Sequence, residues 1–234
     1  MTEALLTVIV PVYQEEGAIA GVLDDWTRAL GALAIDYRLR VYDDGSRDGT
    51  AAILERLARA DERIEVVHQE NRGHGPTILR GYREAESPWI FQMDGDGEMP
   101  ADAFAGLWER REAYDLLVGD RRDRESAPLR RLVSASSRLL VRLSFGRGPR
   151  DVNAPYRLWR GDALRPLLAR IPEGAFAPNV LLSGLAARAR LRIFETPVAH
   201  HGRRTGRGSL DLRRLAAGVF RSARETLATA WRQR

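Results

Sequence analysis

The chain of 234 residues contains neither cysteine nor lysine. Without cysteine there can be no disulfide, no thiolate metal ligand and no cysteine nucleophile, so a bound metal would need oxygen or imidazole ligands. Without lysine, all 37 basic side chains are arginine, and a Walker phosphate loop is excluded because it requires lysine. Biased codon usage explains the total, whereas local arginine clusters suit phosphate or anionic lipid, whose oxygens the planar guanidinium matches in pairs.

Long apolar runs are also missing. No stretch approaches the roughly 20 apolar residues of a membrane-spanning helix, and the N-terminus lacks the pattern of a secretory signal peptide. We therefore expect a cytoplasmic chain, in solution or peripheral on the cytoplasmic face of a membrane. The net charge is +5, but the arginines are scattered among 32 acidic residues, which argues against a nucleic-acid-binding protein.

Short apolar runs alternate with amphipathic segments along the chain. The predicted strands are 5–12, 38–42, 64–68, 89–93, 114–118, 155–159 and 191–197. The predicted helices are 18–33, 48–60, 77–85, 100–113, 129–145, 162–169, 179–188 and 212–231. This alternation predicts an α/β fold, with a mostly parallel, doubly wound sheet flanked by helices. With 44% hydrophobic residues the chain can build one sizeable core, so a single domain over 1–234 is expected.

Acidic residues collect at the carboxyl ends of three predicted strands. Glu15 follows the first strand, Asp43 and Asp44 end the second, and the run 94–98 follows the fourth. One acidic turn is usually a solvated loop or a helix cap. Three such turns should border one crevice, because ligands of open α/β sheets bind beyond the carboxyl ends of the strands.

The run Asp94-Gly95-Asp96 has the spacing of a cation site. In an extended chain, carboxylates two residues apart project to the same side and can share one ion. The glycine allows the backbone and a diphosphate to approach closely. An all-oxygen site completed by water suits Mg²⁺ or Mn²⁺.

Three motifs together resemble family 2 glycosyltransferases of the GT-A type. They are Val8-Ile9-Val10-Pro11-Val12-Tyr13-Gln14-Glu15, Tyr42-Asp43-Asp44-Gly45-Ser46-Arg47-Asp48-Gly49-Thr50 and Met93-Asp94-Gly95-Asp96-Gly97. A short acidic DxD motif is common by chance, but its place downstream of the other two is not. The resemblance implies a GT-A fold and a metal-dependent, inverting hexosyltransferase that uses a UDP- or GDP-sugar.

The same resemblance assigns the donor residues. It implies that Pro11, Tyr13, Glu15, Asp43 and Asp44 surround the nucleotide base and ribose. It further implies that Asp94 and Asp96 hold the metal that bridges the donor diphosphate, with Asp96 counted as catalytic.

The later part of the chain resembles the polyprenyl-phosphate branch of the family, which includes the dolichyl-phosphate mannose synthases. In that branch the residue at Glu98 can be a further metal ligand. Gly119-Asp120-Arg121 and Pro128-Leu129-Arg130-Arg131 are similar to branch motifs, which implies that Arg121 and Arg131 bind the acceptor phosphate. The segment 151–158 resembles another and places Asp151 near the reacting centre, as a catalytic residue.

A late loop, 203–209, resembles the branch segment that closes over the diphosphate. The resemblance implies that Arg204 and Arg207 bind the donor there, with Arg203 competing with Arg204 for one role. The branch lysine after Ser209 is missing, because Leu210 stands in its place. Together, these assignments divide the chain into a nucleotide-sugar-binding half (1–100), an acceptor-binding half (101–210) and a C-terminal amphipathic helix (211–234).

Three alternatives stay open at this point. The acceptor is a polyprenyl phosphate, or else a sugar or other hydroxyl that would need Asp151 as a base, whereas a phosphate would leave Asp151 an orienting role. A sugar-phosphate nucleotidyltransferase would share the metal–carboxylate crevice. The basic amphipathic helices 129–145 and 212–231 either pack on the domain or contact a membrane surface or a membrane-anchored partner.

Overall fold

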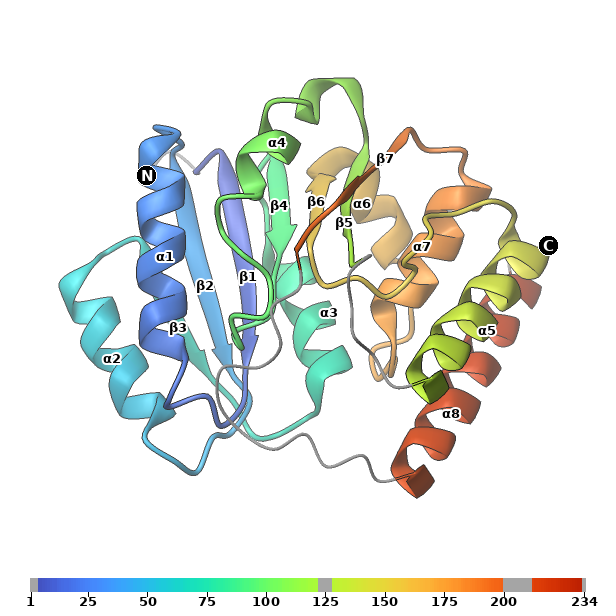
Figure 1. Cartoon of the computed structure of the whole chain (residues 1–234), viewed down its shortest axis with the longest axis horizontal. Helices are drawn as coiled ribbons and strands as arrows, with labels where there is room; N and C mark the ends of the chain where they lie inside the picture. The colour runs from blue at the N-terminus through green and yellow to red at the C-terminus, as the bar shows by residue number, and fades with distance from the viewer. Residues whose placement is uncertain (1–3, 122–127, 200–211, 233–234) are drawn as a thin grey trace.

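The computed structural model describes residues 4–121, 128–199 and 212–232. Its seven-stranded sheet has the order β3-β2-β1-β4-β6-β5-β7 (Figure 1). The strands are β1 (Leu6–Val12), β2 (Tyr37–Asp43), β3 (Ile64–His68), β4 (Trp89–Gln92), β5 (Leu116–Asp120), β6 (Arg157–Arg160) and β7 (Ile193–Pro197). Only β6 runs antiparallel to its two neighbours, β4 and β5.

The helices lie on both faces of this sheet. They are α1 (Ile19–Ala32), α2 (Thr50–Ala60), α3 (His74–Glu84), α4 (Phe104–Trp108), α5 (Pro128–Phe145), α6 (Gly161–Leu168), α7 (Pro178–Arg188) and α8 (Leu212–Trp231). One core cluster joins the sheet to α1, α2 and α4, and a second joins it to α3, α6 and α7. The predicted strands and helices are therefore present, most with ends shifted by one to three residues.

One predicted helix is wrong in length. The segment 100–113 forms only the short α4 and a 3₁₀ turn at Arg111–Ala113. Phe104, Leu107 and Trp108 are buried, but the residues from 109 to 112 are all charged and offer no apolar side chain to continue that face.

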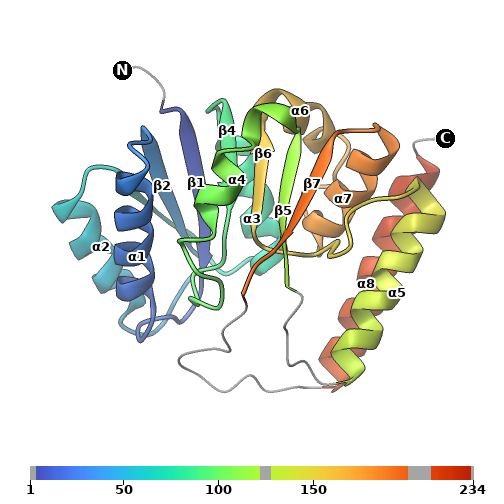
Figure 2. The ribbon, with the colours of Figure 1, turned by 45° about the horizontal axis from the view of Figure 1, so that its top comes forward.

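Helices α5 and α8 lie side by side at one edge of the molecule, outside α7 (Figure 2). Their inner residues, such as Val141, Phe145 and Ala230, belong to the core cluster on that side. Large apolar side chains on both helices are nevertheless exposed: Leu132, Leu139, Leu143, Phe220, Leu227 and Trp231. Among the described residues, no helix combines the length and hydrophobicity needed to cross a bilayer.

Candidate functional site

Three carboxyl-terminal strand ends meet at one cleft. Strands β2, β1 and β4 are neighbours and run parallel, so their following turns lie next to each other. The first cleft, of about 450 Å³, is lined by Pro11, Val12, Tyr13, Glu15, Asp44, Asn71, Gly73, His74, Thr77, Asp94, Gly95 and Asp96. The structure thus brings together every predicted donor residue of the N-terminal half except Asp43.

Asp44 fixes one wall of the first cleft. Its Oδ1 accepts hydrogen bonds from the side chain of Gln69 at 2.7 Å and from the backbone N–H of Arg72 at 2.8 Å. Its Oδ2 accepts one from the backbone N–H of Gly73 at 2.8 Å. Because this buried carboxylate is held by three donors, it orders the turn between β3 and α3.

Asp43 is buried, does not line the first cleft, and has a polar partner on each carboxylate oxygen. Its Oδ1 accepts from the N–H of Ser46 at 3.0 Å, and its Oδ2 lies 2.9 Å from Nδ1 of His68. The other ring nitrogen of His68 lies 2.9 Å from Oε1 of Glu55. Hydrogen bonding to Glu55, and then to Asp43, raises the pKa of His68 although partial burial opposes the charge. Asp43 therefore stabilises the turn of the motif 42–50 through its own hydrogen bonds. Nucleotide binding by its side chain stays a prediction.

The acidic turn after β4 packs tightly against the end of β1. A Cβ on Gly95 would lie 2.9 Å from Cγ2 of Val12, so only glycine lets the two segments approach this closely. Asp94 Oδ1 accepts a hydrogen bond from Gln92 at 3.2 Å and lies 3.4 Å from Nε2 of His74. Asp96 Oδ1 accepts from the N–H of Glu98 at 3.0 Å, which holds the turn closed.

The predicted metal ligands share a small hollow. Asp94, Asp96 and Glu98 line it together with Tyr156 and Pro155 from the loop before β6. This all-oxygen set fits Mg²⁺ or Mn²⁺, which in nucleotide sites take one or two carboxylates together with phosphate and water. In the described part of the chain no three acidic or histidine side chains already converge as a metal centre. Asp94 and Asp96 would supply the one or two carboxylates that a Mg²⁺ or Mn²⁺ site of this kind requires.

A second cleft, of about 380 Å³, also borders Asp94. It is lined by Arg72, Gly73, His74, Gly75, Pro76, Ile78, Asp94, Arg121, Asn153, Pro155, Phe176, Ala177, Pro178, Asn179 and Arg221. Because Gly73, His74 and Asp94 line both clefts, the two are adjacent. Three arginines face the second cleft, from all three of the predicted parts of the chain.

Gly75 brings the distant wall of the second cleft into place. A Cβ at this position would lie 2.2 Å from the carbonyl oxygen of Phe176 and 2.7 Å from that of Ala175. Glycine is thus needed for α3 to begin against the segment that precedes α7. Arg221 of α8 lies over the ring of Phe176, with its guanidinium carbon 5.5 Å from the ring centre.

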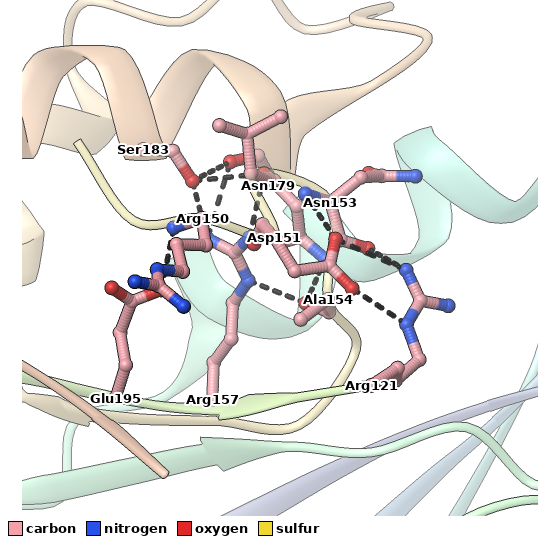
Figure 3. Close-up of polar contacts among 10 residues, drawn as sticks. Arg121, Arg150, Asp151, Asn153, Ala154, Arg157, Asn179, Ser183 and Glu195 are labelled. Carbon is pink, nitrogen blue, oxygen red and sulfur yellow. Dashed lines mark hydrogen bonds and ion pairs between the residues drawn. The ribbon is translucent and has the colours of Figure 1, made fainter. Parts of the chain in front are cut away.

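Arg121 and Asp151, predicted separately, form a bidentate ion pair (Figure 3). The two hydrogen bonds are 2.7 and 3.2 Å, and the side chains are only 12% and 16% exposed. Burial opposes the charge on Asp151, but the Arg121 guanidinium outweighs it and holds the pKa of this carboxyl below its usual value. Burial likewise opposes the charge on Arg121, while attraction to Asp151, Asp94 and Glu98 raises its pKa overall. Both groups are therefore charged near neutral pH.

Arg157, which sequence patterns did not single out, holds the turn that carries Asp151. Its side chain is fully buried and donates to the carbonyls of Asp151, Val152 and Ala154, and to Asn179 and Ser183 of α7 (Figure 3). Burial lowers the pKa of Arg157 to about 10, so it remains charged near neutral pH. A buried cation is costly unless its donors are satisfied, and here the turn that carries Asp151 supplies the acceptors.

Other predicted residues cannot be placed. The side chain of Arg131, in the first turn of α5, and the residues Arg203, Arg204 and Arg207 lie outside the described residues. Arg72, Phe176 and Arg221 were missed, although Arg72 stands in the turn after a predicted strand, where a ligand-binding residue could have been sought.

Sequence comparison identifies relatives of this chain. The family described as glycosyl transferase family 2 matches residues 7–157. An undecaprenyl-phosphate 4-deoxy-4-formamido-L-arabinose transferase from Pseudomonas fluorescens is 28% identical over 218 residues, covering 92% of this chain and 62% of that protein. The protein of the same name from Proteus mirabilis is 27% identical over 204 residues, covering 86% and 61%. The chain thus spans less than two thirds of the length of these relatives.

Solved structures share the fold. Mannosyl-3-phosphoglycerate synthase from Rubrobacter xylanophilus superposes with a TM-score of 0.66 at 14% identity, covering 98% of this chain and 74% of that one. Glucosyl-3-phosphoglycerate synthase from Mycobacterium tuberculosis, in complex with Mn²⁺, UDP and glucosyl-3-phosphoglycerate, gives 0.66 at 19% identity, covering 97% and 80%. A mannosyltransferase from Pyrobaculum calidifontis with GDP-Man and Mn²⁺ gives 0.60 at 18% identity, covering 98% and 73%. The predicted α/β fold of the GT-A type is confirmed.

The family match covers the three motifs from which the resemblance was inferred, and it extends from β1 through the Asp151 turn to the start of β6. Together with the shared fold and the acidic cleft at the ends of β1, β2 and β4, it shows that this chain belongs to glycosyl transferase family 2.

Proposed function

We propose that this chain is an inverting glycosyltransferase that moves a sugar from a UDP- or GDP-sugar to a polyprenyl phosphate. The observation that carries the proposal is the pair of adjacent clefts that share Asp94, one lined by carboxylates and the other by Arg72, Arg121 and Arg221. The first would hold the nucleotide and the second the acceptor phosphate, with the sugar where they meet.

Binding of the sugar donor is supported by the carboxylates that line the first cleft. Asp94 and Asp96, with Glu98 beside them, would hold Mg²⁺ or Mn²⁺, which when bound neutralises charge on the leaving diphosphate. Similar structures contain Mn²⁺ with UDP or GDP-Man. Pro11, Tyr13, Glu15 and Asp44 would form the wall against the base and ribose, and Arg204 and Arg207 would close over the diphosphate.

The acceptor side is supported by the charges around Asp151. The acceptor oxygen would attack the anomeric carbon opposite the departing nucleoside diphosphate, forming one C–O bond as the other breaks. A sugar hydroxyl would have to lose a proton to a base, yet the pKa of Asp151 is lowered by Arg121, which weakens it as a base. A phosphate acceptor is already an anion and fits arginine side chains, and the similar curated proteins are undecaprenyl-phosphate sugar transferases. Asp151 then orients Arg121, which with Arg131 binds the acceptor phosphate.

We also propose that the chain is peripheral on the cytoplasmic face of a membrane. A polyprenyl acceptor is embedded in lipid, so the enzyme must reach the bilayer surface. Exposed apolar side chains occur on both α5 and α8, such as Leu143 and Trp231, and α5 also carries exposed arginines such as Arg138 and Arg142. An anionic lipid surface would match this combination of apolar and basic groups.

The decisive experiment is a thermal-shift panel of UDP-, GDP- and dTDP-sugars with and without Mn²⁺. At least one donor should raise the Tm of the wild type in a metal-dependent way, and Asp96→Asn should abolish that shift because it removes a charged ligand. Transfer assays then compare polyprenyl phosphate with sugar hydroxyl acceptors, and nucleoside triphosphate plus sugar phosphate tests for nucleotidyl transfer. Equal shifts in wild type and Asp96→Asn would contradict the donor site.

A further inference from the structure

Beneath the acidic turn lies a polar side chain that the reaction outlined above does not use. Gln92 is the last residue of β4 and is 0% exposed. Because side chains alternate along a strand, Gln92 and Asp94 point to the same side of the sheet, on which α3 and α7 pack. The Gln92 amide nitrogen donates to Oδ1 of Asp94 at 3.2 Å.

The orientation of the Gln92 amide is fixed by Asn179 at the start of α7. Asn179 Nδ2 lies 2.9 Å from Oε1 of Gln92 and 3.4 Å from the carbonyl oxygen of Ala154. Because the Ala154 carbonyl can only accept, the group that Asn179 turns toward it must be the NH₂. The same NH₂ then requires the oxygen of Gln92, which leaves the nitrogen of Gln92 facing Asp94. In this orientation Oε1 of Gln92 also accepts a hydrogen bond from the hydroxyl of Tyr82 at 3.3 Å.

We infer that Asn179 and Gln92 are positioning residues for Asp94, an inference that rests on the proposed function. The chain of donors runs from Asn179 to Gln92 to Oδ1 of Asp94 and holds that oxygen in place. Oδ2 of Asp94 has no hydrogen bond to another residue in the described part of the structure, so it is available to a ligand. A carboxylate held in this way loses little rotamer freedom when the ligand arrives, which favours binding.

Asn179 also reaches the second cleft. Its backbone carbonyl accepts from Arg157, and Arg157 binds the carbonyls of Asp151 and Val152 (Figure 3). Gln92 and Arg157 are direct partners across β4 and β6. The first turn of α7 is therefore a common support for the carboxylate of the first cleft and for the turn that carries Asp151.

The test replaces Gln92 by methionine, which is similar in size and length but has no N–H to donate. Ile90→Val is the matched control, because Ile90 is equally buried, two residues earlier on the same strand and face. The probes are UDP and GDP with Mn²⁺, followed by calorimetric titration, and the Tm of each ligand-free protein is measured in parallel.

We expect Gln92→Met to weaken the binding of Mn²⁺ and nucleotide by about tenfold, while Ile90→Val leaves it unchanged. Asn179→Ala should weaken binding in the same direction, with an additional loss of Tm because Ala154 and Gln92 both lose a partner. If the wild type binds nucleotide and Gln92→Met binds it equally well, the positioning role is wrong and the proposed function stands.

A crystal structure of ligand-free Gln92→Met provides a readout that needs no ligand. The inference requires the Asp94 side chain to leave its wild-type rotamer or to become disordered, and an unchanged carboxylate contradicts it. If no wild-type protein binds any nucleotide with Mn²⁺, the proposed function fails, and this structure alone decides whether Asn179 and Gln92 position Asp94.

Discussion

At the residue scale, two basic side chains that sequence patterns did not single out support residues of the candidate site. Arg157 stands in a stretch that reads as an ordinary strand, yet its guanidinium is buried and binds the turn that carries Asp151. His68 ends an edge strand, yet it links Asp43 of the second motif to Glu55 of α2. Burial and partners of this kind depend on segments distant in sequence, so no local pattern could have shown them.

His68 provides a pH-dependent prediction. Its folded-state pKa is raised by Glu55 and Asp43, so protonation stabilises the fold. This contribution is complete below the ordinary histidine pKa of about 6.5 and is lost as the pH rises through the folded-state value. His68→Gln should therefore lower the Tm more at about pH 5.5 than at about pH 8.5.

The size of the effect is limited because the His68 side chain is 43% exposed. Exposed ion pairs contribute about 0.2–1 kcal/mol, which corresponds to a Tm change between about 0.4 and 4 °C for a chain of this size. Calorimetry of wild type and variant at both pH values measures it. A Tm difference that is the same at the two pH values would show that His68 does not act through its charge.

At the scale of elements, α5 and α8 differ from the other helices in what they leave exposed. Helices α3, α6 and α7 bury their large apolar residues in the core, whereas Leu143, Phe220 and Trp231 are each more than 70% exposed. Soluble domains seldom leave several large apolar side chains uncovered on adjacent helices. The two possibilities left open by the sequence can therefore both hold. One face of each helix packs on the domain, and the opposite, exposed face can contact a membrane.

A vesicle experiment tests the membrane side of this interpretation. The double variant Leu143→Ser with Trp231→Ser should reduce cosedimentation with vesicles containing anionic lipid by roughly tenfold, because each buried CH₂ contributes about 0.8 kcal/mol to membrane binding. Leu5→Ser is the matched control, since Leu5 is also an exposed leucine but precedes β1, away from both helices. If the double variant and the control bind vesicles as the wild type does, these side chains do not contact lipid.

At the scale of the whole molecule, the features that could be predicted from the sequence depend on short local patterns. The features that were missed depend on contacts between segments far apart in the chain. Strand runs and strand-end carboxylates are short patterns, so the sheet and most of the first cleft could be derived from them. The second cleft joins Arg72, Phe176 and Arg221, which are far apart in sequence and meet only because Gly75 lets α3 touch the segment before α7. Arg121 and Asp151 were found through resemblance, but their ion pair required the folded chain.

If the two clefts bind donor and acceptor separately, a change in one should leave binding in the other unaffected. Substitution of Arg221 tests this. It lines the second cleft only, is bonded to Glu225 and to the carbonyl of Gly174, and lies over Phe176. Losing one charged hydrogen bond to phosphate costs about 1.5–3 kcal/mol, so Arg221→Gln should raise the KM for polyprenyl phosphate by about tenfold or more. The donor-induced thermal shift should stay at its wild-type value, because no atom of the first cleft changes.

Arg224→Gln is the control for that measurement. Arg224 is on the same helix and carries the same charge, but it does not line either cleft. An electrostatic effect of the helix as a whole would raise the KM for polyprenyl phosphate equally in both variants. Only a direct role in the second cleft separates Arg221→Gln from Arg224→Gln, and a simultaneous loss of donor binding in Arg221→Gln would mean that the two clefts do not act as independent subsites.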